Sequence, residues 1–438
     1  MRLHFYAGIL VAPFLVLAAL TGLACAAAPE LDRYLYGGVL RAERADGPAR
    51  PLADQVRAAR AAQPEGAVTS VVPPADPGAT TRVEFEVAGL ADRRRIVHVD
   101  PYTARVRGVR TGEPGSTPVG TWLSEAHASL HLGAPGRLYL ELAASWLWVI
   151  VLGGLVLWLG RGRHYRGRSP ARRAFLHDRR ARGVRRTRGR HAVAGVWTAA
   201  GLLVLSVTGL TWSDHAGARV DALERAFGGT PALDIRLPEE AARDEATSRD
   251  PGSQAGRVLA AARAAGLTGP VEITPALAPG TAWTVAQTDH RWPVRKDRVA
   301  VDPVTGRVTA RVAWSDHPPV ARLRFLGSQL HRGPLFGWAN RVVLAVVMAG
   351  LLVVIARGYR MWWQRRPTRA DRRAPFGRPP SRSAWRRLPV SVAVAGLPVL
   401  VALVWALPVL GLTLPLFLAV DASVGVLRRR RAPARPPP

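Results

Sequence analysis

Two segments far apart in the chain share one pattern: HFYAGILVAPFLVLAALTGL at His4–Leu23 and HAVAGVWTAAGLLVLSVTGL at His191–Leu210. Each begins with a histidine, has Ala-Gly at the same offset and ends in Thr-Gly-Leu, and the two align without a gap. Each is also apolar over about 20 residues, the length that a helix needs to cross a bilayer. The chain therefore contains a duplicated membrane helix, which indicates a repeated structural unit.

Two further matches extend the repeat. VDPYTARV at Val99–Val106 matches VDPVTGRV at Val301–Val308, and LHLG at Leu130–Gly133 matches LHRG at Leu330–Gly333. Each LHxG motif lies shortly before the next apolar block, so the unit is a helix, an outer domain and a second helix, present twice. Because both copies start on the same side of the membrane, they are parallel repeats related by an axis along the membrane normal.

The charge of the chain indicates its topology. Lys plus Arg number 61 against 31 Asp plus Glu, the net charge is +30, and Lys296 is the single lysine. Most of the excess lies in three short segments, 161–190, 357–387 and 428–435, whereas the long segments between the helices are almost neutral. This is the positive-inside pattern. It favours anionic membrane lipids as partners of the arginines and predicts no nucleic-acid partner.

Two of the apolar blocks need interpretation. The first could be a secretory signal, because Arg2 precedes an apolar run that ends in small residues. Its repeat mate lies deep inside the chain, where no signal peptide can be, so we expect the first helix to be retained. The block from Leu388 to Leu427 is about twice the length of one span, with Pro408 near its middle, and is expected to form two helices joined by a tight turn.

These features predict an integral membrane α-helical bundle of four core helices and two C-terminal helices, with two external α+β domains. The expected order is helix 1–28, external domain 29–138, helix 139–160, cytoplasmic arginine-rich loop 161–190, helix 191–212, external domain 213–335, helix 336–357, cytoplasmic arginine-rich linker 358–387, helix hairpin 388–427 and basic tail 428–438.

Each external domain is predicted to be one helix packed on an antiparallel sheet. The first has a helical pattern at Pro51–Gln63 before alternating, strand-like runs, and Asp-Pro-x-Thr in both domains is typical of a turn between two strands. Cys25 is the single cysteine, which excludes an internal disulfide, a CxxC zinc site and a four-thiolate cluster supplied by this chain alone.

The histidines carry the candidate chemistry. His4 and His191 are repeat mates at the cytoplasmic edge of the bundle, and His131 and His331 are matched by the LHxG motif at its outer edge. His127 lies four residues before His131, on the same face if a helix begins that early. A single histidine at a helix end can simply mark the membrane interface. Two symmetric pairs at two depths favour function, because polar groups in bundles usually face the interior.

A pair of imidazoles in an apolar bundle suits haem better than zinc. Zinc usually needs three or four ligands, whereas haem iron needs two axial ligands and its flat macrocycle fits between apolar helices. Small residues near the inner histidines would let the ring approach the backbone. The distance between the two layers leaves room for two b-type haems, one near each membrane face, as an electron path.

The combination of motifs resembles a known family. The H-x3-G start and Thr-Gly end of the repeated helix, the VDPxTG-like turn, the LHxG motifs and the terminal WWQRRP resemble the PepSY-associated transmembrane proteins, over about residues 1–368. That group includes iron-regulated membrane proteins and ferrisiderophore reductases. The resemblance implies four core helices, two external PepSY domains and, in the reductases, haem held by helix-borne histidines that reduces ferric iron at the outer face.

By this resemblance His4 and His191 match the H-x3-G histidines and His331 matches the histidine of the second LHxG motif. In the first half the family's usual spacing fits His127, whereas the internal repeat selects His131, and both stay candidates. One departure from the family pattern is Ala104, which occupies the position of the turn glycine.

Two functions follow as hypotheses. The first is a haem-bearing electron conduit in a bacterial cytoplasmic membrane, with both termini inside, which reduces a ferric siderophore or another external acceptor. The chain has no glycine-rich dinucleotide motif, so its electrons would come from a quinol or a separate reductase. The second is a non-enzymatic protein whose PepSY domains bind a peptide, a protease or a siderophore complex as an uptake accessory or regulator. Whether the chain is an enzyme stays open at this point, and its catalytic residues are unknown. A transporter is disfavoured because no core helix has the mid-span break of a substrate site.

Overall fold

The structure is a computed structural model that describes residues 2–43, 47–90, 92–115, 117–162, 182–237, 251–276, 278–364 and 390–430. Residues 163–181 of the arginine-rich loop, 365–387 of the linker and 431–438 of the tail lie outside the described residues. The chain forms two compact units. A helical unit contains Met1–Leu23, Ala126–Leu223 and Val342–Pro438, and a sheet unit contains Ala24–Glu125 and Glu224–Arg341.

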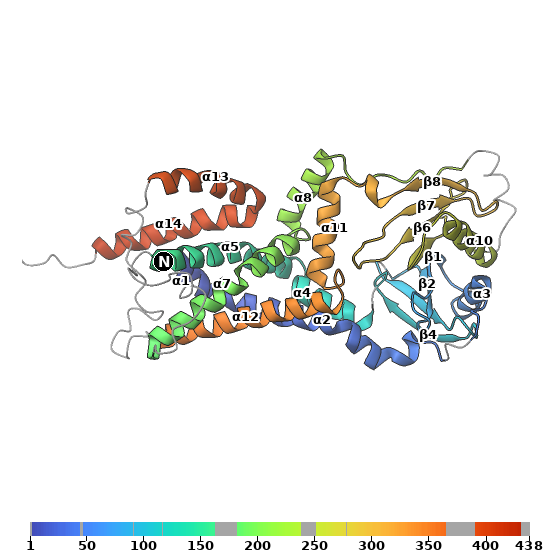
Figure 1. The fold of residues 1–438 in the computed structure, drawn as a ribbon, viewed down its shortest axis with the longest axis horizontal. Helices are drawn as coiled ribbons and strands as arrows, with labels where there is room; N and C mark the ends of the chain where they lie inside the picture. The colour runs from blue at the N-terminus through green and yellow to red at the C-terminus, as the bar shows by residue number, and fades with distance from the viewer. Residues whose placement is uncertain are drawn as a thin grey trace, which may run out of the picture. The chain divides into compact units, whose positions relative to one another are not determined.

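Within the described residues, five helices are long and apolar enough to cross a membrane (Figure 1). These are α2 (Ala12–Leu40), α5 (Ala134–Gly162), α7 (Gly183–Leu210), α12 (Trp338–Gln364) and α14 (Pro408–Arg430). The apolar helix α13 (Val390–Ala406) is shorter than a full span and precedes α14, which begins at Pro408, where the sequence predicts a turn.

The first repeated helix, which the sequence predicts over residues 1–28, is interrupted near its start by Pro13. It forms α1 (Arg2–Leu10) and α2, separated at Val11. Proline has no backbone N–H, so Pro13 cannot donate to the carbonyl of Ile9 four residues before it. Tyr359 of α12 supplies the missing donor, because its hydroxyl donates to Ile9 O over 2.9 Å. The carbonyl that Pro13 leaves without a backbone donor is therefore hydrogen-bonded by a side chain from another helix.

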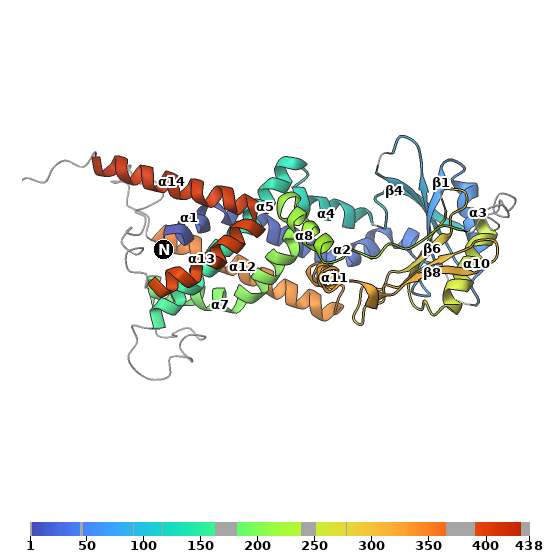
Figure 2. The same cartoon turned by 90° about the horizontal axis from the view of Figure 1, so that it is seen from above.

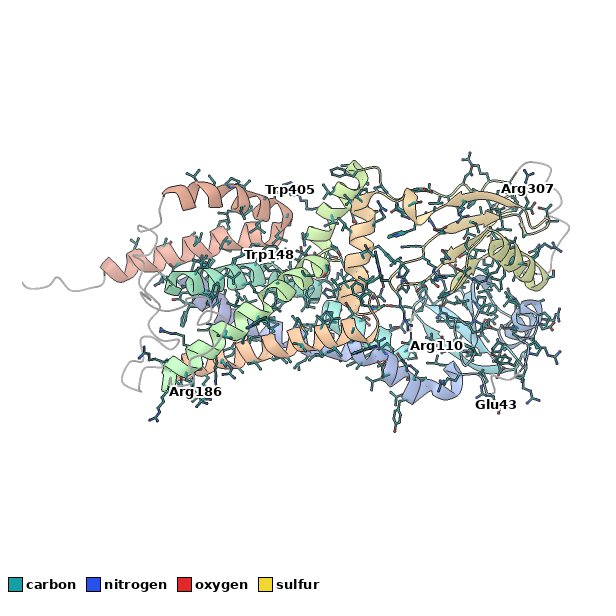
Figure 3. The ribbon with its side chains drawn as sticks, viewed as in Figure 1. Glu43, Arg110, Trp148, Arg186, Arg307 and Trp405 are labelled. Atoms are coloured by element: carbon teal, nitrogen blue, oxygen red, sulfur yellow. The ribbon has the colours of Figure 1, made fainter. Side chains whose placement is uncertain are left out.

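Small residues bring the helices of this unit together. A Cβ added at Gly350 of α12 would lie 2.3 Å from Thr198 Cγ2 of α7, and one at Gly201 would lie 2.7 Å from Val347 Cγ2. Close backbone approach through small residues is the usual way in which membrane helices pack. A polar tie joins α5 to α7 as well, since Trp148 Nε1 donates to Ser206 Oγ over 3.1 Å (Figure 3).

The sheet unit differs from the two separate domains that the sequence predicts. Its strands form one antiparallel eight-stranded sheet in the order β4-β3-β2-β1-β5-β6-β7-β8, so each half of the chain contributes four neighbouring strands. The halves join where β1 pairs with β5 and Val71 lies opposite Ile273, beside a hydrogen bond from Ser70 Oγ to Glu272 Oε1 of 2.7 Å. The strands are β1 (Ala67–Val72), β2 (Thr81–Glu86), β3 (Arg94–Val99), β4 (Val106–Gly112), β5 (Val271–Thr274), β6 (Trp283–Gln287), β7 (Arg298–Val301) and β8 (Val308–Val312).

One helix from each half packs on the sheet, as the sequence predicts. These helices are α3 (Leu52–Ala62) and α10 (Pro251–Ala264), and both lie on one face (Figure 2). Alternate strand residues such as Val83, Phe85 and Val299 point to these helices and are fully buried. The other α-helices among the described residues are α4 (Pro118–Ser129), α8 (Asp214–Ala226) and α11 (Pro319–Arg332).

The two Asp-Pro-x-Thr motifs form equivalent turns. Asp100 Oδ1 accepts from the backbone N–H groups of Tyr102 and Thr103, and Asp302 accepts from the corresponding two. Each turn ends on a residue in the left-handed region, with φ of 55° at Ala104 and 71° at Gly306. A Cβ is unfavourable in that region, so the first turn carries strain that the second avoids.

We expect Ala104→Gly to raise the stability of the protein by about 1 kcal/mol, because glycine adopts a positive φ without a steric cost. Gly306→Ala is the matched reverse change and should destabilise. The midpoint of thermal unfolding of the full chain in detergent measures both. If Ala104→Gly leaves the unfolding midpoint unchanged or lowers it, Ala104 is not strained.

The second face of the sheet carries a buried polar cluster. His98 is 3% exposed. Its Nε2 accepts from Arg110 Nε over 3.0 Å, which leaves Nδ1 to donate to Thr80 Oγ1 over 3.0 Å. Burial, helped by the charges of Arg110 and Arg82, lowers the pKa of His98 to about 3. His98 is therefore neutral in the folded protein.

This cluster predicts acid sensitivity. In the unfolded chain His98 takes up a proton below a pH of about 6.5, whereas the folded protein resists protonation down to about 3. The contribution of His98 to the free energy of unfolding is thus fully present above pH 6.5. It falls as the pH decreases, by about 2–3 kcal/mol at pH 4.5. His98→Gln should remove this part of the pH dependence of the unfolding midpoint. An unchanged pH profile in that variant would contradict the assignment.

Candidate functional site

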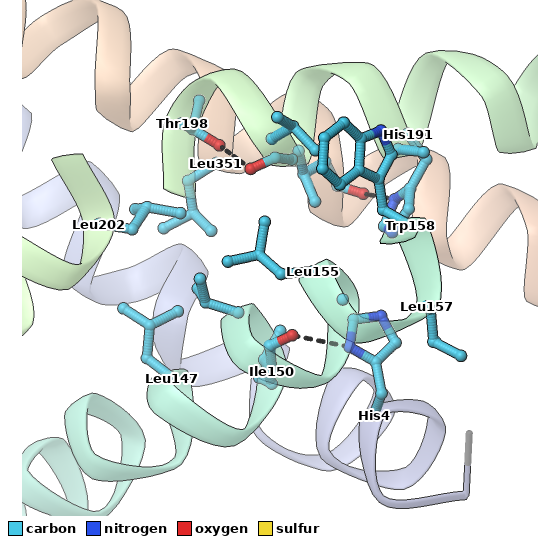
Figure 4. Close-up of a pocket in the computed structure, with 16 residues that line it drawn as sticks. His4, Leu147, Ile150, Leu155, Leu157, Trp158, His191, Thr198, Leu202 and Leu351 are labelled. Carbon is cyan, nitrogen blue, oxygen red and sulfur yellow. Dashed lines mark hydrogen bonds between the residues drawn. The ribbon is translucent and has the colours of Figure 1, made fainter. Parts of the chain in front are cut away.

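The structure brings His4 and His191 together at one end of the helical unit. His4 lies on α1 and His191 on α7, and their ring centroids are 6.4 Å apart with an angle of 78° between the ring planes. The pair faces a cavity between α1, α5, α7 and α12 (Figure 4). Two histidines at equivalent positions of the repeat thus share one site.

Each ring is held by a backbone carbonyl of the helix that follows in its own repeat. His4 Nδ1 lies 2.8 Å from Ile150 O of α5, and His191 Nδ1 lies 2.9 Å from Val354 O of α12 (Figure 4). A carbonyl oxygen only accepts, so Nδ1 carries the proton in both rings. Each neutral imidazole therefore keeps an unprotonated Nε2, the form in which histidine binds a metal.

Glycine makes these carbonyls accessible. A helical side chain covers the turn that precedes it, so the residue four positions after a carbonyl normally shields it. That position is Gly154 for Ile150 and Gly358 for Val354. A Cβ on Gly154 would lie 3.2 Å from His4 Cε1, and one on Gly358 would lie 3.6 Å from His191 Cε1. Both repeats thus use the same arrangement of histidine, carbonyl and glycine.

The cavity beside the two rings is apolar and has a volume of about 90 Å³. Its lining includes Leu147, Leu155, Trp158, Leu202 and Leu351. The volume is that of about three water molecules. A larger planar ligand fits here only when lining side chains such as Leu155 and Trp158 turn aside.

Two neutral imidazoles that face one cavity are a donor set that would suit a haem iron. Their ring centroids lie 6.4 Å apart. Across the described part of the chain, no three His, Cys, Asp or Glu side chains gather to hold a metal ion. The residues present therefore fit a haem better than a bare metal ion.

A third histidine, His127 of α4, lies against the Thr-Gly end of the first repeated helix. Its Nδ1 is 2.8 Å from Thr21 Oγ1, which also lies 2.8 Å from Leu17 O, and the ring is hydrogen-bonded to the Ala18 carbonyl as well. These contacts hold the ring against the end of the first repeated helix. A Cβ on Gly22 would lie 3.3 Å from His127 Cε1, so the glycine leaves room for the ring.

His131 is placed differently. It is exposed, and its φ of 57° puts it in the turn between α4 and α5. His331 lies in the last turn of α11, in the sheet unit. The LHxG motifs align His131 with His331, but the helices of the two repeats align in a different register.

When the two repeats are aligned on the starts of their core helices, the register is shifted by four residues from the LHxG alignment. Gly133 and Gly337, with φ of 63° and 60°, each precede the first residue of a core helix. The same offset aligns the segment SEAH that ends at His127 with SQLH that ends at His331. His127 is therefore the structural mate of His331. In the sequence, the family's usual spacing favoured His127, whereas the internal repeat selected His131, because a shift of four residues keeps a helical residue on the same face.

Sequence reasoning also missed a buried carboxylate in α5. Glu141 is 3% exposed and accepts from the backbone N–H of Ala216 over 2.8 Å and from that of His215 over 3.2 Å. His215 Nδ1 lies 3.1 Å from the same carboxylate. Glu141 thus caps the first turn of α8, which begins at Asp214. Its place near the start of an apolar helix could have signalled a specific partner.

A family model described as the PepSY-associated TM region matches residues 1–365. The chain belongs to this family. The resemblance drawn from the sequence motifs is thereby confirmed, and α13 and α14 lie beyond the matched residues. No curated protein matches the chain. Within this PepSY-associated chain, the paired histidines and the glycines beside their carbonyl partners form the candidate site.

The two glycines allow a matched test of this geometry. Gly154→Ala would place its methyl group 3.2 Å from His4 Cε1, closer than an ordinary contact, whereas Gly358→Ala leaves an ordinary 3.6 Å. We expect Gly154→Ala to lower the unfolding midpoint in detergent more than Gly358→Ala does. Equal effects would mean that His4 does not pack against Gly154.

Proposed function

We propose that this PepSY-associated chain is a haem-binding membrane protein that transfers electrons, most simply to ferric-siderophore iron outside the cell. The observation that carries the proposal is the His4–His191 pair, in which two imidazoles with unprotonated Nε2 atoms lie 6.4 Å apart beside an apolar cavity. A bound b-type haem would supply a one-electron ferric/ferrous couple at this site.

The chain's own residues account for the requirements of such a site. His4 and His191 would hold the haem iron, and their Nδ1–H bonds to Ile150 O and Val354 O hold the rings in place. A hydrogen bond of this kind also raises the basicity of the ligating nitrogen. The lining beside the pair is mostly aliphatic, and Leu351, which belongs to it, is 5% exposed.

A second haem is proposed on the other histidines of the repeat. His127 is held by a hydrogen bond to Thr21 and by one to the Ala18 carbonyl. His331 is proposed as a ligand because it is the mate of His127 in the repeat. His131, the alternative in the first half, is disfavoured by its place in an exposed turn.

The charge distribution supports an orientation for this path. The arginine-rich segment 161–190 directly precedes His191, and the segment 357–387 begins three residues after Val354. We therefore propose that the His4–His191 pair lies toward the cytoplasm of a bacterial cell, with both termini inside and the sheet unit outside. Electrons would come from a quinol or a separate reductase, and the protein would act as a ferric-iron reductase.

An absorption spectrum tests the proposal. The protein, purified in mild detergent after expression with adequate haem, should show a Soret band that shifts on reduction with dithionite. His4→Ala and His191→Ala should each remove the same part of the band, whereas His131→Ala, the matched control, should leave it unchanged. A wild-type protein without a Soret band would refute the haem proposal and favour the non-enzymatic alternative, a binding role for the PepSY-like sheet unit.

A further inference from the structure

The C-terminal helix α14, outside the residues that the family model matches, packs against the two helices that hold His4. On α5, Trp146 Nε1 donates to Thr413 Oγ1 of α14 over 2.9 Å. Phe417 of α14 meets Trp146 with ring centroids 5.6 Å apart and meets Tyr6 of α1 at 5.8 Å. Figure 1 shows α14 next to α5.

An ion pair adds to this contact at the end that carries the histidine. Arg2 of α1 donates from Nε to Asp421 Oδ2 of α14 over 3.2 Å, and its Nη2 donates to Oδ1. The two side chains are 15% and 22% exposed. A bidentate pair shielded to this degree fixes geometry more strongly than a surface pair does. Arg2 is two residues from His4, so the pair acts on the helical turn that presents the imidazole.

The repeated helix is interrupted in the first repeat and continuous in the second. In the second repeat, α7 runs from Gly183 to Leu210 and carries His191 two turns after its start. In the first repeat, Val11 N still donates to Ala7 O and Leu15 N to Val11 O, but Pro13 gives no hydrogen bond to Ile9 O, so the segment that carries His4 is less firmly joined to α2. Both ends of α1 are tied from outside: Ile9 O accepts from Tyr359, and Arg2 is paired with Asp421.

The buried side chains of α14 agree with a structural role inside the unit. Leu410 is 2% exposed and Leu414 is 9% exposed, and both belong to the same apolar core as Ala7 of α1 and Val151 of α5. The helix is therefore part of the core that surrounds the inner histidine.

We propose that α14 positions His4, with Asp421 as the residue that fixes the first turn of α1 through Arg2. The inference deepens the proposed function, because His4 is the proposed ligand of the inner haem. Asp421 acts through Arg2 and is a positioning residue. The same chain supplies a matched control, the half-exposed pair of Arg137 Nε and Asp214 Oδ2 at 2.9 Å.

The test combines a haem readout with one that needs no haem. Asp421→Asn, Asp214→Asn and the charge swap Arg2→Asp with Asp421→Arg are each purified as the full chain, and the midpoint potential of the His191-dependent haem is measured. In parallel, Tyr6→Cys with Phe417→Cys is placed in a Cys25→Ser background, and thiol cross-linking in membranes reports how closely α1 stays against α14.

We expect Asp421→Asn to shift the midpoint potential of the inner haem and to lower the cross-link yield several-fold, the swap to restore both, and Asp214→Asn to change neither. A potential that stays at the wild-type value in Asp421→Asn overturns the proposal, even if the cross-link yield falls. An unchanged cross-link yield overturns it as well. If the wild-type protein binds no haem, the proposed function fails, and the cross-link yield alone decides whether Asp421 positions α1.

Discussion

The hydrogen bond from an imidazole Nδ1 to a helix carbonyl is the interaction around which the helical unit is arranged. A carbonyl inside a helix already accepts from its own helix, and its second lone pair is normally covered by the side chain one turn later. Gly154 and Gly358 remove that cover, so His4 and His191 can reach Ile150 O and Val354 O. The approach of α1 to α5 and of α7 to α12 follows from this bond.

The same bond links the repeat to the proposed chemistry. It fixes which nitrogen carries the proton, and in an apolar cavity the neutral ring avoids the cost of a buried charge. The helix that carries each histidine and the helix that supplies its carbonyl belong to one repeat, so duplication of a single unit supplies both halves of the inner pair. His127 is instead held by a threonine hydroxyl and by the Ala18 carbonyl, both on the first repeated helix.

Much of this could be predicted from the sequence, and the failures have physical causes. The apolar lengths, the repeated histidines and the Asp-Pro-x-Thr turns are local signals, and each corresponds to a feature of the structure. The carbonyls of Ile150 and Val354 carry no signal because every residue has one. The single sheet was missed because β1 and β5 have the composition of ordinary strands, and pairing between two edges is decided by backbone groups that the sequence does not mark.

The two halves also diverge where the sequence shows it, at Pro13. Its counterpart in the repeat is Ala200, inside the unbroken α7. The proline frees Ile9 O in apolar surroundings, where an unpaired carbonyl would cost about 1–3 kcal/mol. The Tyr359 hydroxyl donates to this carbonyl. The counterpart of Tyr359 in the first half is Leu155, which has no hydrogen-bond donor, and α7 needs none because it has no proline at Ala200. Pro13 in one half is thus compensated by the Tyr359 hydroxyl in the other. The histidine pair is symmetric, whereas the helices around it are not.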